Sequence, residues 1–132
     1  HGGISLTTEH LLAACVKVGH AAFAISYDPG NIIYYTQGER RPETEVAEVA
    51  ANVSTLIIKD CSVEQGKPDV MVTVGDGLVD FAVVLGELLN GGFAGPSYVE
   101  CVGGQGVEQV DRDLSFTLGY IRGIYAALGT AG

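Results

Sequence analysis

The chain has 132 residues, of which 47% are hydrophobic and 17% are charged, enough apolar residues for one folded domain with a core. Its formal net charge of −9 would repel a phosphate backbone, so we expect no nucleic-acid partner. No apolar run approaches the roughly 18 residues that a membrane span needs, and we therefore expect no membrane partner either.

The cysteines of the chain are Cys15, Cys61 and Cys101. Their wide spacing and odd number fit neither a zinc motif nor a framework of disulfides. This usage favours a reducing compartment, and we expect the protein to be cytoplasmic.

Strand-like and helix-like segments alternate along the chain, which is typical of βα units on a parallel sheet. Thr7 or Thr8 is predicted to cap a first helix, which Gly19 ends. A buried strand is predicted over residues 21–27, and the turn residues 28–31 break it.

A second helix is predicted from Pro42, which suits a first helical turn. Its inward stripe would consist of Val46, Val49, Ala50 and Val53. A second buried strand follows over residues 55–58. Residues 62–77 are typical of a loop, with a possible short strand at 70–74.

Asp80 is predicted to cap a third helix, and the Asn-Gly-Gly sequence at 90–92 to end it. A short strand at 97–99 and a last helix from about Asp111 complete the chain. The side chains that this last helix is expected to bury are Leu114, Leu118, Ile121 and Tyr125.

Charged residues stand at the ends of three predicted strands. They are Asp28, the pair Lys59 and Asp60, and Glu100. Because parallel strands bring their carboxyl ends to one rim, and ligands bind at that rim, the carboxylates predict a metal or substrate site. Carboxylate oxygens suit divalent ions such as Mg²⁺ or Mn²⁺.

Five segments, in this order, resemble motifs of the xylose-isomerase-like TIM barrel family of sugar phosphate isomerases and epimerases. They are SYDPGN at 26–31, LIIKD at 56–60, VGDGLVDF at 74–81, GFAGPSYVE at 92–100 and DRDLSF at 111–116. Together they cover nearly the whole chain.

The resemblance implies a (β/α)₈ barrel, which takes roughly 250 residues. Residues 1–132 would form a single domain equal to its C-terminal half, with the last three βα units and a preceding helix. His1, Gly2 and Gly3 resemble the end of the fifth strand, and a chain that starts at His1 rather than Met hints at an omitted upstream segment. The expected partner is therefore an N-terminal half-barrel or another subunit.

In that family a divalent metal (Mn, Mg, Co or Zn) is held by Glu, Asp, His and Glu from successive strand ends. The resemblance implies that Asp28 and Glu100 are metal ligands and that Glu100 is also the catalytic acid and base. It implies a substrate contact for Asn31. Lys59 and Asp60, at the predicted mouth of the barrel, are expected to contact substrate, and a structural pair at the strand end is an equal alternative.

The sequence departs from the family at its histidine ligand, since Ile57 stands there and has no lone pair to donate. His10 and His20 are poor replacements, because one lies within a predicted helix and the other precedes the first strand. Either the metal site is rebuilt in this chain or the metal chemistry has been lost.

Three hypotheses follow. The first is part of a metal-dependent isomerase or epimerase that moves a proton between adjacent carbons of a ketose or polyol. The second is a non-catalytic barrel subunit, or a ligand-binding α/β domain, without the metal site. The third is an independent open α/β sandwich that shares only the βα pattern.

Overall fold

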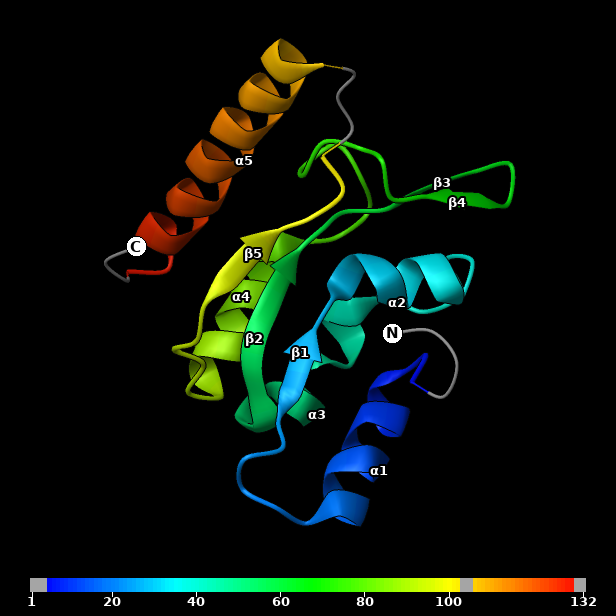
Figure 1. Cartoon of the computed structure of the whole chain (residues 1–132), viewed down its shortest axis with the longest axis vertical. Coiled ribbons are helices and arrows are strands. Elements are labelled where there is room, and N and C mark those ends of the chain that lie inside the picture. Colours follow the sequence, from blue (N-terminus) through cyan, green and yellow to red (C-terminus); the bar gives the residue numbers. More distant parts are fainter. Residues whose placement is uncertain (1–4, 103–105, 130–132) are drawn as a thin grey trace.

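A parallel sheet organises the structure, which is a computed structural model describing residues 5–102 and 106–129. Its strands lie in the order β1 (Ile25–Tyr27), β2 (Val53–Ile58) and β5 (Ser97–Val99), as Figure 1 shows. Helical segments connect each strand to the next, so the predicted βα units are confirmed. Residues 1–3, which resemble the end of a fifth strand, lie outside the described residues.

The helices pack against one another along one side of the sheet, except for α2 (Pro29–Tyr35), which lies at the carboxyl end of β1. The others are α1 (Thr8–Val18), α3 (Val46–Val49), α4 (Phe81–Asn90) and α5 (Val107–Ala127). Helix α1 contacts α3, α3 contacts α4, and α4 contacts α5. In Figure 1, α3 and α4 lie behind the sheet, and no described helix covers its near face. Within the described ranges, none of the helices has both the length and the apolar character to cross a bilayer.

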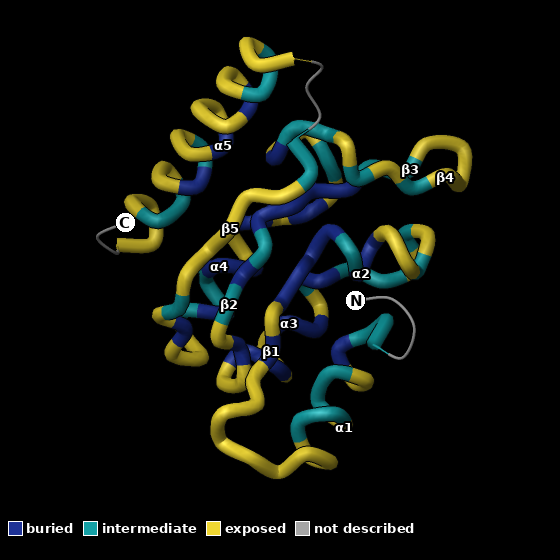
Figure 2. Tube along the Cα trace, in the orientation of Figure 1, coloured by how far each residue is buried: buried dark blue, intermediate teal, exposed yellow. Residues whose placement is uncertain are grey.

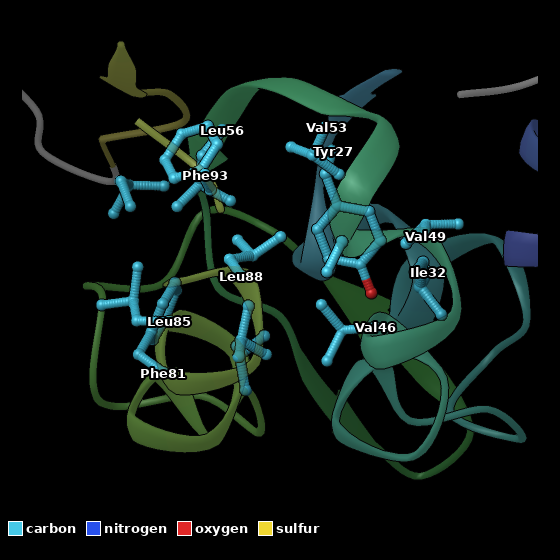
Figure 3. Close-up of a cluster of buried hydrophobic side chains, with 14 of the residues drawn as sticks. Tyr27, Ile32, Val46, Val49, Val53, Leu56, Phe81, Leu85, Leu88 and Phe93 are labelled. Atoms are coloured by element: carbon cyan, nitrogen blue, oxygen red, sulfur yellow. The ribbon is translucent and has the colours of Figure 1, made fainter. Parts of the chain in front are cut away.

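The core lies between the sheet and these helices. Tyr27 and Leu56 pair across β1 and β2, and both are fully buried. Figure 3 shows them in one cluster with Phe81 of α4. Ser26, which points the other way, is exposed, whereas Ile57 is half-buried. Each large apolar side chain buried here contributes about 1.5–3 kcal/mol, which holds the sheet against one layer of helices.

The predicted helix ends are confirmed at four places. Thr7 caps α1, and Gly19 ends that helix in the left-handed conformation at φ 59°. The Asp80 carboxylate accepts hydrogen bonds from the N–H groups of Ala82 and Val83, at 3.0 and 3.2 Å, and so caps α4. Helix α4 ends at Asn90, as the two following glycines predict.

The first strand and the helical connection between β1 and β2 differ from the prediction. The strand expected over 21–27 forms only at β1. The expected second helix is divided into a 3₁₀ turn η1 (Pro42–Thr44), α3, and a second 3₁₀ turn η2 (Ala50–Asn52). The predicted stripe is nevertheless buried, but Val53 belongs to β2, because β-branched residues from 53 onward favour a strand.

The expected loop at 62–77 contains a β-hairpin, and residues 70–74 form no strand. Strands β3 (Ser62–Glu64) and β4 (Lys67–Asp69) are antiparallel. The two residues that join them, Gln65 and Gly66, have φ values of 50° and 76°. Positive φ at both positions is typical of a two-residue hairpin turn, and glutamine is an unusual residue for the first of them.

The prediction for the last helix was wrong about its start and about part of its buried face. Helix α5 begins at Val107, and Ile121 is buried as expected, but Leu114 and Leu118 are 39% and 49% exposed. Figure 2 shows most of α5 as exposed. The helix instead turns Tyr120 towards α4, where its ring meets Phe81 edge-on with centroids 6.3 Å apart.

A group of polar side chains is buried beneath α1. Thr8 and Tyr27 are 0% exposed and Glu45 is 6% exposed. The Thr8 Oγ1, the Tyr27 hydroxyl and both Glu45 carboxylate oxygens have no hydrogen-bond partner within the described residues. Burial raises the pKa of Glu45, although the Arg40 guanidinium, 3.5 Å away, acts in the opposite direction. Ionisation of Glu45 therefore lowers the free energy of unfolding of the protein.

We expect Glu45→Gln to stabilise the protein at pH 7 by on the order of 1 kcal/mol. A carboxyl whose pKa is raised by folding binds protons more tightly in the native state, so stability falls as the pH rises through that raised pKa. The amide does not titrate, so the gain should vanish near pH 3, well below the ordinary pKa of a glutamate, where Glu45 is protonated in both states. Urea denaturation at pH 3 and pH 7 measures the difference, and an equal effect at both pH values would contradict this account.

Candidate functional site

The carboxyl ends of the three parallel strands bring three charged residues to one rim. Asp28 follows β1, Lys59 follows β2 and Glu100 follows β5. Ile57 pairs with Tyr98 on the face that no described helix covers, and side chains two residues apart share a face. Lys59 and Glu100, each two residues further on, therefore also project from that face.

The Lys59 ammonium joins the two carboxylates. Its Nζ donates to Asp28 Oδ2 at 2.9 Å and also forms an ion pair with Glu100 Oε2. The expectation that Asp28 and Glu100 meet at a common rim is therefore confirmed. Their roles as metal ligands, and that of Glu100 as acid and base, are untested by this geometry.

Asp28, Lys59 and Glu100 form a group that we call the rim cluster, which has a buried side and an exposed side. The side chains of Asp28 and Lys59 are 5% and 6% exposed, whereas that of Glu100 is 56% exposed. Burial acts to raise the pKa of Asp28 and to lower the pKa of Lys59. For Lys59 the hydrogen bonds to Glu100 and Asp28 outweigh burial, and its pKa is raised. The ammonium therefore keeps its proton, and Glu100 is the member of the cluster that an incoming molecule can reach.

Helix α2 holds Asp28 in place. The Asp28 carboxylate caps this helix by accepting from the Asn31 backbone N–H at 3.0 Å, and the Asn31 side-chain amide donates to it at 2.6 Å. A Cβ at Gly30 would lie 2.7 Å from the Lys59 carbonyl oxygen, so only glycine allows α2 to approach β2 this closely. Asn31 thus lies beside the cluster, and its contact with substrate stays a prediction.

The Asp60 side chain forms hydrogen bonds with backbone N–H groups. Its carboxylate is buried, at 1% exposure for the residue, and accepts hydrogen bonds from four N–H groups. The donors are Cys61 at 2.8 Å, Gly75 at 2.9 Å, and Gly77 and Val79 at 3.0 Å. These hydrogen bonds give Asp60 a structural role, which is to fix the loop after β2. Its contact with substrate stays a prediction.

The cysteines near the rim are poor nucleophiles. Burial raises the pKa of Cys61 to about 11, and the pKa of Cys101 is also raised, mainly by burial. Both are free thiols, as is Cys15. A thiol with a raised pKa carries little thiolate at neutral pH, which agrees with a packing role for these residues.

The residues at the rim do not fit a divalent metal as they are arranged. Within the described ranges, no group of three or more His, Cys, Asp or Glu side chains is placed to hold a metal ion. Asp28 and Glu100 supply two carboxylates, but Ile57 offers no lone pair and the Lys59 ammonium lies between them. A divalent ion bound by both carboxylates would have to take the place of that ammonium.

A hollow of about 480 Å³ lies at the other end of the sheet. Its lining includes His20, Phe23 and Val53, which stand before β1 or at the start of β2. His20 is therefore placed at the opposite end of the strands from Asp28 and Glu100. This agrees with the prediction that it does not replace the missing histidine ligand.

The arrangement defines a class, namely part of a parallel α/β barrel with charged groups at the carboxyl ends of its strands. The sequence profile of the family described as "Xylose isomerase-like TIM barrel" matches residues 1–118, so the chain belongs to that family. The search of curated proteins returned no match.

Two solved structures have a similar fold. One is a xylose isomerase domain protein from Planctomyces limnophilus, at 24% identity and a TM-score of 0.75, with 92% of this chain and 44% of that chain covered. The other is a xylose isomerase-like TIM barrel protein from Mycobacterium smegmatis in complex with magnesium, at 19% identity and a TM-score of 0.71. That match covers 89% of this chain and 40% of the other. The chain thus spans less than half the length of either structure, and the fold prediction of a partial barrel is confirmed.

Sequence reasoning did not predict that Lys59 would bridge both carboxylates. The signal was present, since a lysine ends the middle strand and an acidic residue ends the strand on each side. The bridge could be predicted only from the order of the strands in the sheet, because only a lysine on the middle strand has a carboxylate on each neighbouring strand within reach.

Proposed function

We propose that this chain is the C-terminal part of a barrel enzyme that moves a proton between adjacent carbons of a ketose or related polyol. The observation that carries the proposal is the rim cluster, in which Glu100 is exposed beside a buried ammonium. Family membership supports this class of substrate and reaction. The magnesium in the M. smegmatis structure supports a metal-dependent form, whereas the rim residues of this chain do not fit the metal.

The chemistry needs a base and a positive group near the substrate carbonyl. The Glu100 carboxylate takes a proton from the carbon next to the carbonyl, and the C–H electron pair moves to form an enediolate. The same carboxylic acid then returns the proton to the neighbouring carbon, while the hydroxyl proton moves to the former carbonyl oxygen, and this completes an isomerisation. An epimerisation requires a second acid on the opposite face of the enediolate, which the N-terminal part of the barrel would supply. Of the three N–H donors of Lys59, two serve Asp28 and Glu100, which leaves one for the developing oxyanion.

We propose that an N-terminal half-barrel, in the same protein or in another subunit, completes the fold. Three observations support this partner. Within the described residues, β1 and β5 are the edge strands of the sheet, with no further strand beside either of them. Tyr98, on the face without a helix, is 57% exposed. Leu114 and Leu118 form an exposed apolar stripe on α5. Such edges and apolar faces are normally covered. A reducing cytoplasmic setting suits the free cysteines.

Exchange of substrate protons with solvent tests the proposed reaction. The assembled protein is incubated in D₂O with a panel of ketoses, ketose phosphates and cyclic polyol ketones, and deuterium at the carbon next to the carbonyl is followed by NMR. We expect incorporation into at least one compound, together with its isomer or epimer. Absence of exchange across the panel would contradict the enzymatic proposal.

A non-catalytic barrel that binds a sugar or polyol is the second candidate. Ile57 favours it, because this residue replaces the ligand on which the family's metal chemistry depends. Calorimetric titration with the same panel separates the two. Binding without exchange supports the second candidate, and exchange in the same sample supports the first.

A further inference from the structure

The position of the Lys59 ammonium resembles that of a bound cation. Nζ lies 2.9 Å from Asp28 Oδ2 and also contacts Glu100 Oε2. Divalent ions bind carboxylate oxygens at about 2.0–2.6 Å, so an ion held by these two oxygens would overlap with the ammonium. The lysine and a metal ion therefore exclude each other from the space between Asp28 and Glu100.

The backbone around Lys59 is held at both sides. The next residue, Asp60, is bound by four backbone N–H groups, and the Lys59 carbonyl is packed against Gly30. The side chain is 6% exposed, so the ammonium has little open space to move into if an ion were to displace it. Displacement would leave a charged group buried without a partner, which is strongly unfavourable.

We infer that Lys59 is the resident cation of this site, and that the chain uses its ammonium where related barrels use a divalent metal. The inference rests on the proposed function, since it assigns the charge-stabilising group of the same reaction.

Binding of Mn²⁺ by the assembled protein tests the inference. The protein is labelled with ¹⁵N, and paramagnetic broadening of the amide signals of Asp28, Lys59 and Glu100 is followed during titration at pH 7.5. We expect no selective broadening in the native protein or in Lys59→Arg, which keeps the charge. Lys59→Met keeps the length of the side chain without the charge and should bind Mn²⁺ at least 10-fold more tightly than the native protein. Lys67→Met, at an exposed position of the hairpin, should behave like the native protein.

Equal Mn²⁺ binding at this rim by the native protein and Lys59→Met would overturn the inference. If Lys59→Met does not fold, the native protein alone decides, through the NMR signal of its Lys59 ammonium. The inference predicts that this ammonium signal keeps its chemical shift and line width as Mn²⁺ is added. If the signal disappears selectively and the effect saturates with Mn²⁺ concentration, the inference is contradicted. Because the readout is metal binding, it is independent of the exchange assay. A protein that excludes Mn²⁺ but exchanges no proton would contradict only the proposed reaction.

Discussion

Asp60→Ala is expected to destabilise the protein by about 3–5 kcal/mol, the range seen when one partner of a buried charged interaction is removed. The Asp60 carboxylate satisfies the N–H groups of Cys61, Gly75, Gly77 and Val79. Each buried donor left without an acceptor costs about 1–3 kcal/mol, although part of this cost is relieved when water enters the loop. Urea denaturation at pH 7 measures the loss.

Asp69→Ala is the matched control, because the Asp69 carboxylate accepts from one N–H group, that of Met71, in an exposed hairpin. It should cost less than about 1 kcal/mol. Hydrogen exchange adds a local test, since the amides of Gly75, Gly77 and Val79 should exchange faster in Asp60→Ala than in the native protein. Equal destabilisation by the two variants, or unchanged exchange at these amides, would show that Asp60 does not fix the loop.

Glu100→Gln is expected to lower proton exchange into the substrate by roughly 10²–10⁴-fold, the usual contribution of a positioned acid or base. Glutamine has nearly the same shape and can still accept a hydrogen bond from Lys59, but it cannot take a proton. Substrate affinity should therefore change little, and kcat should carry the loss. The deuterium exchange assay with the responsive substrate gives both values.

Glu108→Gln is the control for charge, because Glu108 is an exposed carboxylate in the first turn of α5. It should leave exchange unchanged. The side chain of Glu100 is 56% exposed, so its amide variant should also melt within a few degrees of the native protein. Retention of near-native kcat in Glu100→Gln would exclude this residue as the base.

The βα order and the rim were predictable because they depend on local signals. Apolar runs ended by turn residues predict the strands, and parallel strands bring their ends together whatever helices lie between them. The caps at Thr7 and Asp80 were also local, since each depends on a side chain within three residues of the N–H groups that it satisfies.

The features that the sequence did not predict depend on contacts between distant residues. On α5, Leu114 and Leu118 share the helical spacing of a buried stripe. The buried face is instead the one that presents Tyr120 to Phe81 of α4, and a pattern within one helix does not contain that partner. The end of the second predicted helix was also misplaced. Its apolar stripe includes Val53, which belongs to β2, and hydrophobicity does not change where the helical segment ends and the strand begins.

The roles of Lys59 and Asp60 differ for the same reason. They are adjacent, and both were expected at the mouth of the barrel. A strand alternates its side chains, so Lys59 projects among the carboxylates while Asp60 turns towards the loop of residues 74–79. Only the folded loop shows that its N–H groups converge on one carboxylate.

A crystal structure of the assembled protein is the most direct measurement of the arrangement on which both proposals depend. We predict that Lys59 Nζ will lie within hydrogen-bonding distance of one oxygen of Asp28 and one oxygen of Glu100, at the carboxyl ends of neighbouring parallel strands. Carboxylates on opposite faces of the sheet, or a Lys59 side chain directed away from either of them, would contradict the account.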